Sequence, residues 1–298
     1  MVDHIVIPVD GSEESKRAAT RGLELASVVD ATVDVLHVVE QKSLRLAKSA
    51  DEQTRLRERG ESILEEIEAI AADIGRPITT ELTEGKPSVQ IREFAAERDA
   101  TVIVIGRQGV TGLGKRLLGG VTEQVLSRSE IPVLVVPHGD GATTPVTDYS
   151  RILIPTDGSE NADAATQPAV TIARHCGATI DVLNVVDIQN AGGMFSAGGL
   201  ETEFIERLEA VGSEAVDEVA GEIGETAPEV AVTTDVVRTS SLDGVAAGIS
   251  EYVADRDVDL IIMGSHGRSN LGRHVLGSVT SALLRTVDVP ILVVSRSA

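Results

Sequence analysis

Short apolar runs alternate along the chain with longer stretches in which apolar residues recur at helical spacing. In the first half, the short runs are IVIPV, TVDVLHVV, ITTEL, TVIVIG and PVLVVP. Runs that are apolar at every position, such as VIVI and VLVV, are typical of strands covered on both faces. The longer stretches, which predict helices, are SEESKRAATRGLELASVV, ERGESILEEIEAIAADIG and SVQIREFAAERD. Ser12, followed by Glu13 and Glu14, suits a helix start. The alternation predicts an α/β fold, with a five-stranded parallel sheet, right-handed crossovers and helices on both faces.

The same pattern occurs twice. HIVIPVDGSE (4–13) matches RILIPTDGSE (151–160), and ATVDVLHVVE (31–40) matches ATIDVLNVVD (178–187). ERDATVIVIGRQG (97–109) matches DRDVDLIIMGSHG (255–267), and IPVLVVP (131–137) matches VPILVVS (289–295). Such a repeat indicates tandem copies of one unit. We expect two doubly wound domains, residues 1–138 and 149–298, joined by the polar segment HGDGATTPVTDYS.

An insertion distinguishes the second copy. The first two matches have an offset of 147 residues and the last two an offset of 158, so that 11 residues were added between Asp187 and Asp255. The segment QNAGGMFSAGGL (189–200) has no counterpart in the first copy, and its glycines suit a loop.

The charge narrows the choice of partners. The chain has 47 acidic and 26 basic residues, a net charge of −21, and its five lysines all precede residue 116. Nucleic-acid binding requires a basic face, so we expect no nucleic-acid partner. An acidic, lysine-poor surface resembles that of proteins from salt-loving microbes, since self-repulsion is screened at high ionic strength. An ordinary acidic surface is the alternative.

Targeting and thiol chemistry are not evident in the sequence. Apolar runs fall well short of the roughly 18 residues of a membrane span, and MVDHIVIPVD lacks a basic segment before a long apolar one. We therefore expect a soluble, cytoplasmic protein that does not bind membranes. The single cysteine, Cys176, lies in an expected helix-to-strand turn, where we expect a bystander thiol.

Two glycine-rich stretches follow the fourth strand of each copy. They are GSHGRSNLGRHVLGSVT (264–280) and its echo GRQGVTGLGKRLLGGVT (106–122). Glycine lets backbone N–H groups approach a ligand without a Cβ in the way. Consecutive amides before a helix N-terminus form an anion site, and SVTSALLRTV (278–287) is the expected helix. Ser278 either contacts the ligand or caps this helix.

These residues resemble a known family. The spacing of three sites resembles the ATP-binding signature of universal stress proteins: Gly264 and Gly267 with two residues between them, then nine residues, then the pair Gly277-Ser278. The resemblance covers both copies nearly end to end and implies tandem five-stranded α/β domains of the adenine nucleotide α-hydrolase-like type. It implies as ligand ATP, or another adenine nucleotide, with Mg²⁺ arriving on the nucleotide.

The resemblance also implies roles for residues. In the second copy Asp157, with Pro155 and Thr156, would meet the adenosine, and the main chain of Val185 would bond to adenine. The phosphates would be held by Gly264, Gly267, Gly277, Ser278, Val279 and Thr280. Arg268 either adds a charged contact to the phosphates or has its side chain in solvent. The corresponding positions of the first copy are Pro8, Val9, Asp10, Val38, Gly106, Gly109, Gly119, Gly120, Val121 and Thr122. Asp10 and Asp157 have a structural alternative, in which their carboxylates cap the loop that follows. In the insert, Met194 and Phe195 either cover the adenine or belong to an unstructured loop.

The first copy departs from the signature. Gly120 replaces Ser278, Val110 replaces Arg268, and Arg107-Gln108 replaces Ser265-His266. Two phosphate contacts are thereby lost, and we expect the second copy to bind ATP more tightly if both bind.

Signs of catalysis are weak. No His or Cys spacing suits zinc, and the GxxxxGK[ST] loop of phosphoryl-transfer enzymes is missing. His266 is a candidate base near the phosphates, although such a residue more often lines the loop. We assign no catalytic or metal-binding residue and expect slow hydrolysis at most. Three functions remain: a nucleotide-binding regulatory module of the stress response, a nucleotide-free interaction scaffold, and an enzyme of the α-hydrolase group.

The last strand of each copy bears on assembly. LVV in PVLVVP and ILVV in PILVVS resemble the edge strands through which domains of this family pair, and an exposed apolar edge needs cover. We expect the two copies to form an internal dimer. Whether two chains also associate is left open.

Overall fold

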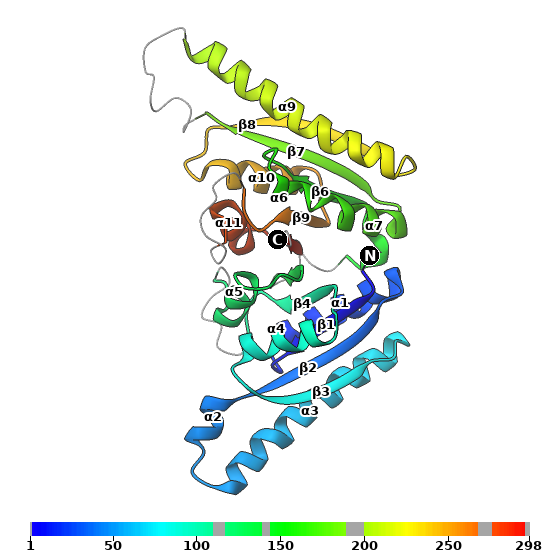
Figure 1. Cartoon of the computed structure of the whole chain (residues 1–298), viewed down its shortest axis with the longest axis vertical. Coiled ribbons are helices and arrows are strands. Elements are labelled where there is room, and N and C mark those ends of the chain that lie inside the picture. The colour runs from blue at the N-terminus through cyan, green and yellow to red at the C-terminus, as the bar shows by residue number, and fades with distance from the viewer. Residues whose placement is uncertain (1, 110–116, 139–143, 189–199, 268–275, 296–298) are drawn as a thin grey trace. The chain divides into compact units, whose positions relative to one another are not determined.

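The computed structural model describes residues 2–109, 117–138, 144–188, 200–267 and 276–295 (Figure 1). The chain divides into two compact units, Met1–Thr147 (unit 1) and Asp148–Ala298 (unit 2). Arg268, Val110 and the pair Met194 and Phe195 lie outside the described residues.

Unit 1 contains a parallel five-stranded sheet. In chain order its elements are β1 (His4–Val9), α1 (Glu13–Val29), β2 (Thr32–Glu40), α2 (Gln41–Leu46), α3 (Ala50–Ile74), β3 (Thr79–Gly85), α4 (Pro87–Glu97), β4 (Val102–Gly106), α5 (Gly120–Leu126) and β5 (Val133–Val136). The strand order is β3-β2-β1-β4-β5, and all neighbours are parallel. The chain winds in opposite directions from β1, so the winding reverses between β1 and β4.

The helices of unit 1 begin and end at capping residues. The Ser12 hydroxyl accepts the Ser15 N–H and starts α1, as the sequence predicts. Helix α3 starts at Ala50, eight residues before the expected Glu58, because Ser49 caps it and accepts the Glu52 N–H. Helix α2 was not expected from the sequence.

Unit 2 repeats this order. Its elements are a short 3-10 helix (Val146–Asp148) that crosses the boundary between the units, β6 (Arg151–Pro155), α6 (Glu160–Asp163), α7 (Thr166–Cys176), β7 (Thr179–Asp187), α9 (Leu200–Thr226), β8 (Val232–Thr239), α10 (Gly244–Asp255), β9 (Leu260–Gly264), α11 (Ser278–Thr286) and β10 (Ile291–Val294). The strand order is β8-β7-β6-β9-β10, again parallel.

One helix of unit 2 is interrupted. The single helix α1 of unit 1 corresponds to α6 and α7, which are separate helices in unit 2. Pro168, at the third position of α7, has no N–H to donate to the Ala164 carbonyl, and its ring crowds that carbonyl. Unit 1 has Arg21 at the corresponding position and keeps a continuous helix.

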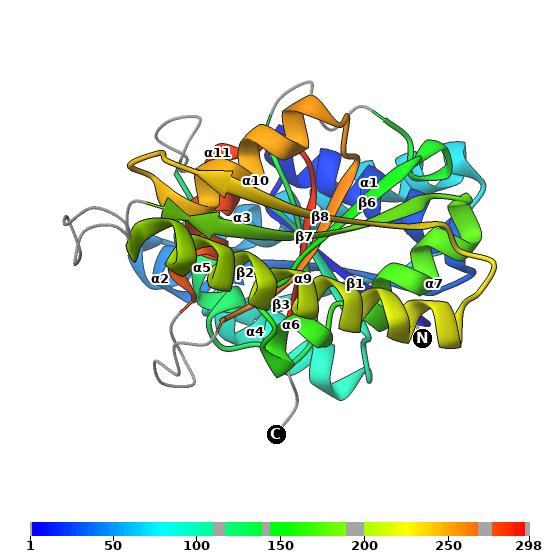
Figure 2. The ribbon, with the colours of Figure 1, turned by 90° about the horizontal axis from the view of Figure 1, so that it is seen from above.

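Helices cover both faces of each sheet. In unit 1, α1 and α3 pack together against the sheet, while α4 and α5 pack together. In unit 2, α7 contacts α9, and α10 contacts α11; Figure 2 shows α9 running beside β7 and β8. The strands between the two helix layers are apolar and buried, including Ile103 to Val104 and Ile261 to Ile262. The predicted fold class is confirmed. Among the described residues, no helix combines the length and apolar character that crossing a bilayer requires.

Candidate nucleotide-binding site

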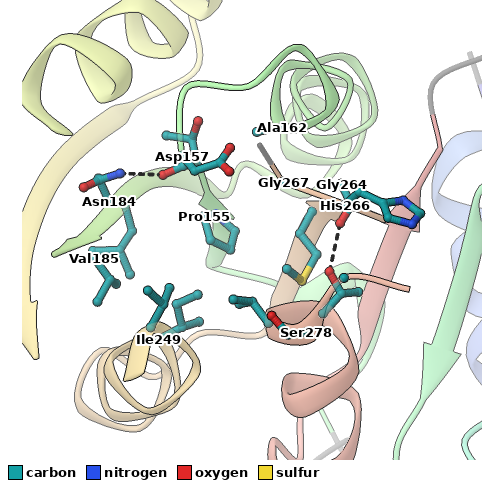
Figure 3. Close-up of a pocket in the computed structure, with 17 residues that line it drawn as sticks. Pro155, Asp157, Ala162, Asn184, Val185, Ile249, Gly264, His266, Gly267 and Ser278 are labelled. Atoms are coloured by element: carbon teal, nitrogen blue, oxygen red, sulfur yellow. Dashed lines mark hydrogen bonds between the residues drawn. The ribbon is translucent and has the colours of Figure 1, made fainter. Parts of the chain in front are cut away.

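A cavity of about 310 Å³ opens at the carboxyl ends of the strands of unit 2. It lies where the winding direction of the sheet reverses, which is where ligands bind in open α/β sheets. Its walls come from the loop after β6, the end of β7, helix α10, the loop after β9 and the start of α11 (Figure 3). Ten of the eleven site residues predicted in unit 2 line it: Pro155, Thr156, Asp157, Val185, Gly264, Gly267, Gly277, Ser278, Val279 and Thr280. Arg268 is the eleventh and is not described.

The loop after β6 holds the Asp157 carboxylate. The Oδ1 atom of Asp157 accepts the Ser159 N–H at 3.1 Å, and Gly158 between them has a φ of 72°. In unit 1, Asp10 Oδ1 accepts both the N–H and the hydroxyl of Ser12, at 3.0 and 2.6 Å. The capping role considered for these aspartates is therefore present, and it involves Oδ1.

The second carboxylate oxygen faces the glycine loop. A Cβ on Gly267 would overlap Asp157 Oδ2, and a Cβ on Gly109 would overlap Asp10 Oδ2 in the same way. Only glycine permits this approach, because no real Cβ comes so close to another heavy atom. The two units thus place the aspartate against the same point of the loop.

Two hydrogen bonds close the base of each glycine loop. In unit 2 the Gly277 N–H donates to the Ser265 carbonyl at 2.9 Å, and the Thr280 hydroxyl donates to the Gly264 carbonyl at 3.1 Å. In unit 1 the N–H of Gly119 and the hydroxyl of Thr122 form the corresponding bonds, both at 2.9 Å. Gly264 has no space for a side chain, since a Cβ would lie 2.5 Å from the Asn161 carbonyl oxygen.

Helix α11 directs its N-terminus into the cavity. Its N-cap is Gly277, and Ser278 is its first residue, so Ser278 is not the helix cap that the sequence left open. The first amides of a helix have no intrahelical acceptor, and the helix dipole adds partial positive charge there. Ser278, Val279 and Thr280 therefore present main-chain N–H groups to an anion. The Ser278 side chain adds a hydroxyl at the same place.

A polar side chain that the sequence analysis passed over lies beside Val185. Asn184 lines the cavity, and its Nδ2 donates to the Thr156 carbonyl at 2.8 Å. In unit 1 His37 takes this position, and its Nδ1 lies 2.8 Å from the Val9 carbonyl oxygen. Because a carbonyl can only accept, Nδ1 carries the hydrogen. The sequence signal for this pair was a polar residue at the same position of both strands, between Leu and Val.

His266 does not point into the site as a base would. It lines the cavity, but its ring extends away from Asp157 and Val185 (Figure 3). Its Nδ1 lies 3.0 Å from the Ser265 hydroxyl, and burial lowers the pKa of the ring. This geometry supports a structural role in the loop.

The predicted positions of unit 1 occupy matching places in its fold. Pro8 and Val9 end β1, Val38 lies in β2, Gly106 ends β4, and Gly119 is the N-cap of α5, which begins with Gly120, Val121 and Thr122. Among the described residues, no atom outside the helix lies within 4 Å of a Cβ built on Gly120.

Thiol and metal chemistry have little support in the described residues. Burial raises the pKa of Cys176 to about 11, so its reactive thiolate form is scarce at neutral pH. Within the described parts of the chain, no three His, Cys, Asp or Glu side chains gather as a metal site.

Comparisons with known proteins agree with the repeat. The sequence model of the Universal stress protein family matches residues 1–137 and 148–295. A universal stress protein of Mycobacterium tuberculosis is 29% identical over 305 residues, which cover 98% of this chain and 97% of that protein. A universal stress protein of Methanocaldococcus jannaschii is 39% identical over 136 residues, covering 44% of this chain and 80% of its own. The crystal structure of a universal stress protein from Archaeoglobus fulgidus aligns with a TM-score of 0.71 at 22% identity, covering 100% of this chain and 97% of its own.

Proposed function

Because this chain belongs to the universal stress protein family as a tandem of two family domains, we propose that it is an adenine-nucleotide-binding regulatory module whose ligand is ATP. The observation that carries the proposal is the cavity of unit 2, where the Asp157 carboxylate, the Val185 main chain and the N-terminus of α11 converge. A carboxylate suits ribose hydroxyls, a strand end suits a base edge, and helix amides suit phosphates.

The residues present fit such a ligand. The cavity is at the lower end of the range of about 300–1,000 Å³ for small-molecule pockets. Gly264, Gly267 and Gly277 line the cavity, and glycine lets a polyphosphate approach the main chain of this loop without a Cβ in the way. We propose that Mg²⁺ enters bound to the phosphates, whose oxygens are its preferred ligands.

The site is better suited to regulation by bound nucleotide than to hydrolysis of the nucleotide. The His266 ring is directed away from Asp157, its Nδ1 lies 3.0 Å from the Ser265 hydroxyl, and burial lowers the pKa of the ring. A general base must reach the proton that it removes. We propose that ATP hydrolysis, if it occurs, is slow, and that bound nucleotide sets the conformation of the module. The pairing of the two copies through β5 and β10 stays a prediction from the sequence.

Small molecules released from freshly purified protein test the proposal. We expect mass spectrometry to find adenine nucleotide in the released fraction, and calorimetry on the stripped protein to detect ATP binding. The Gly264→Val and Gly106→Val double variant is the control, because it fills both loops with side chains. Absence of nucleotide binding by the parent protein would leave the scaffold function in its place.

A further inference from the structure

A polar side chain recurs at the same position in two strands that are otherwise mostly apolar. His37 is the sixth residue of β2 (TVDVLHVVE), and Asn184 is the sixth residue of β7 (TIDVLNVVD). Both are half-buried. A polar group in such a place destabilises the fold unless it is hydrogen-bonded.

Both side chains make the same hydrogen bond. Asn184 Nδ2 donates to the Thr156 carbonyl, and His37 Nδ1 donates to the Val9 carbonyl, each at 2.8 Å. In both residues the donor is two bonds beyond Cβ, which explains how an amide and an imidazole serve interchangeably. In each case the acceptor belongs to the residue just before the site aspartate, Asp157 or Asp10.

The helices above these side chains are shaped to admit them. Gly60 lies in the interior of α3, and a Cβ there would lie 2.7 Å from Leu82 Cδ1 and 2.8 Å from His37 Cδ2. Gly212 lies in the interior of α9, and a Cβ there would overlap Asn184 Oδ1. Glycine weakens a helix interior relative to alanine, so its presence at both places indicates that the side chain beneath needs the room.

The next residue along each strand faces the opposite way. A Cβ on Gly248 of α10 would lie 2.7 Å from Val185 Cγ1, so Val185 packs on α10 while Asn184 packs under α9. Figure 3 shows the Asn184 side chain directed to the segment of Asp157 and the Val185 side chain beside Ile249. The end of β7 is therefore held on both faces.

We propose that Asn184 and His37 are positioning residues for recognition of the nucleobase. Each joins the main chain that reads the base, at Val185 or Val38, to the loop that carries the site aspartate, and so fixes the separation of the two ligand contacts. The inference rests on the proposed function, because it assigns these residues to the adenine end of the same site.

The test measures base selectivity in one unit at a time. The Gly106→Val background silences unit 1, and ATP and GTP are titrated into it by calorimetry. We expect Asn184→Leu to weaken ATP binding about tenfold and GTP binding less, so that the two dissociation constants become more similar. Asn184→His, which installs the residue that unit 1 uses, should restore the parent ratio of the two constants to within about twofold. The reciprocal pair is His37→Leu and His37→Asn in the Gly264→Val background.

Thermal unfolding of each unliganded variant separates positioning from folding. If Asn184→Leu does not fold, Asn184→Ala takes its place, since it removes the donor without adding bulk. A folded variant that keeps the parent ratio of ATP to GTP affinity, or loses both affinities equally, overturns the inference. A parent unit without preference between ATP and GTP also overturns it but leaves nucleotide binding intact, whereas a parent that binds no nucleotide overturns the proposed function as well.

Discussion

The Asp157 carboxylate occupies the space that a side chain on Gly267 would need. We expect Gly267→Ala to displace either the carboxylate or the loop and to weaken ATP binding at least tenfold, because adenosine and phosphate contacts would then no longer share one geometry. Titration calorimetry checks this. Gly221→Ala is the matched control, since no neighbouring atom in the described part of the chain lies within 4 Å of a Cβ at that position of α9. It should leave affinity unchanged and stabilise unit 2 by about 0.5–1 kcal/mol.

The two units should differ in affinity. Ser278 adds a hydroxyl at the start of α11, where unit 1 has Gly120 at the start of α5. A hydrogen bond to a charged group contributes about 1.5–3 kcal/mol, or roughly tenfold to a hundredfold in affinity. We expect the Gly106→Val variant, which keeps the site of unit 2, to bind ATP more tightly than the Gly264→Val variant, which keeps the site of unit 1. Equal dissociation constants for ATP in these two variants would contradict the prediction.

His37 should make unit 1 sensitive to acid. Burial lowers the pKa of His37 below its ordinary 6.5; the Val9 carbonyl and Asp10 oppose this shift, and Arg59 adds to it. As pH falls below about 6.5 the unfolded chain takes up this proton before the native unit does, so the native unit loses stability. The loss should be complete once the pH is below the native pKa.

The variant His37→Asn isolates this effect. Asparagine does not titrate and keeps the hydrogen bond, as Asn184 does in unit 2. We expect the stability of unit 1 to fall less between pH 7 and pH 5 in the variant, measured by hydrogen exchange of the β2 amides. The rest of the chain is identical in the two proteins, so its contributions cancel in the comparison. An unchanged pH profile would show that His37 is not the titrating group.

A buried ionic cluster lies in unit 2 at the end of the sheet away from the cavity. Asp181 is fully buried and accepts from Arg151 at 2.8 Å. The Tyr252 hydroxyl lies 3.1 Å from Asp181 Oδ2 and 2.7 Å from Asp235 Oδ2, and burial together with these carboxylates raises the pKa of Tyr252.

Removing that hydroxyl should destabilise unit 2. We expect Tyr252→Phe to lower the free energy of unfolding of unit 2 by about 1–2 kcal/mol, because the carboxylates of Asp181 and Asp235 lose the Tyr252 hydroxyl as a partner. The loss is limited because Arg151 still donates to Asp181. Hydrogen exchange of the β7 and β8 amides gives the readout. Thr286→Val is the control, because it removes an exposed hydroxyl bond within α11 and should change stability by less than about 0.5 kcal/mol.

Cys176 should be a slow nucleophile. With a pKa of about 11 instead of the 9.0 of an unburied thiol, its thiolate fraction at pH 8 is lower by about two orders of magnitude. The higher intrinsic nucleophilicity of such a thiolate offsets part of this. We expect the folded protein to react with iodoacetamide at least tenfold more slowly than the same chain in denaturant. Equal rates would mean that Cys176 is not shielded.

The strands and the parallel character of the sheet could be predicted because buried parallel strands have a local sequence pattern. Runs such as VIVI are covered on both faces and therefore apolar throughout, and the repeat gave each inference a second, independent reading. Helix boundaries were less accessible. The beginning of α3 at Ala50 depends on the Ser49 cap, and α2 is too short to show a periodicity.

The residues of the candidate site also divide into those that the sequence could reveal and those that required the structure. Sequence and family resemblance were sufficient to select Asp157, Val185 and the glycines, since glycine spacing is a property of the chain itself. Asn184 was missed, because its function depends on the Thr156 carbonyl of another strand and on the gap left by Gly212 in α9.

By itself, the sequence determined the tandem repeat, the α/β class and the loops that line the cavity of unit 2, because apolar periodicity and glycine spacing are properties of residues close together in the chain. Only the tertiary structure decided that Gly267 gives way to Asp157, that Ser278 follows a glycine cap, and that Asn184 joins two strands. The first and the last of these relations depend on distances between residues far apart in the chain, and those distances exist only after the sheet has brought the strand ends together.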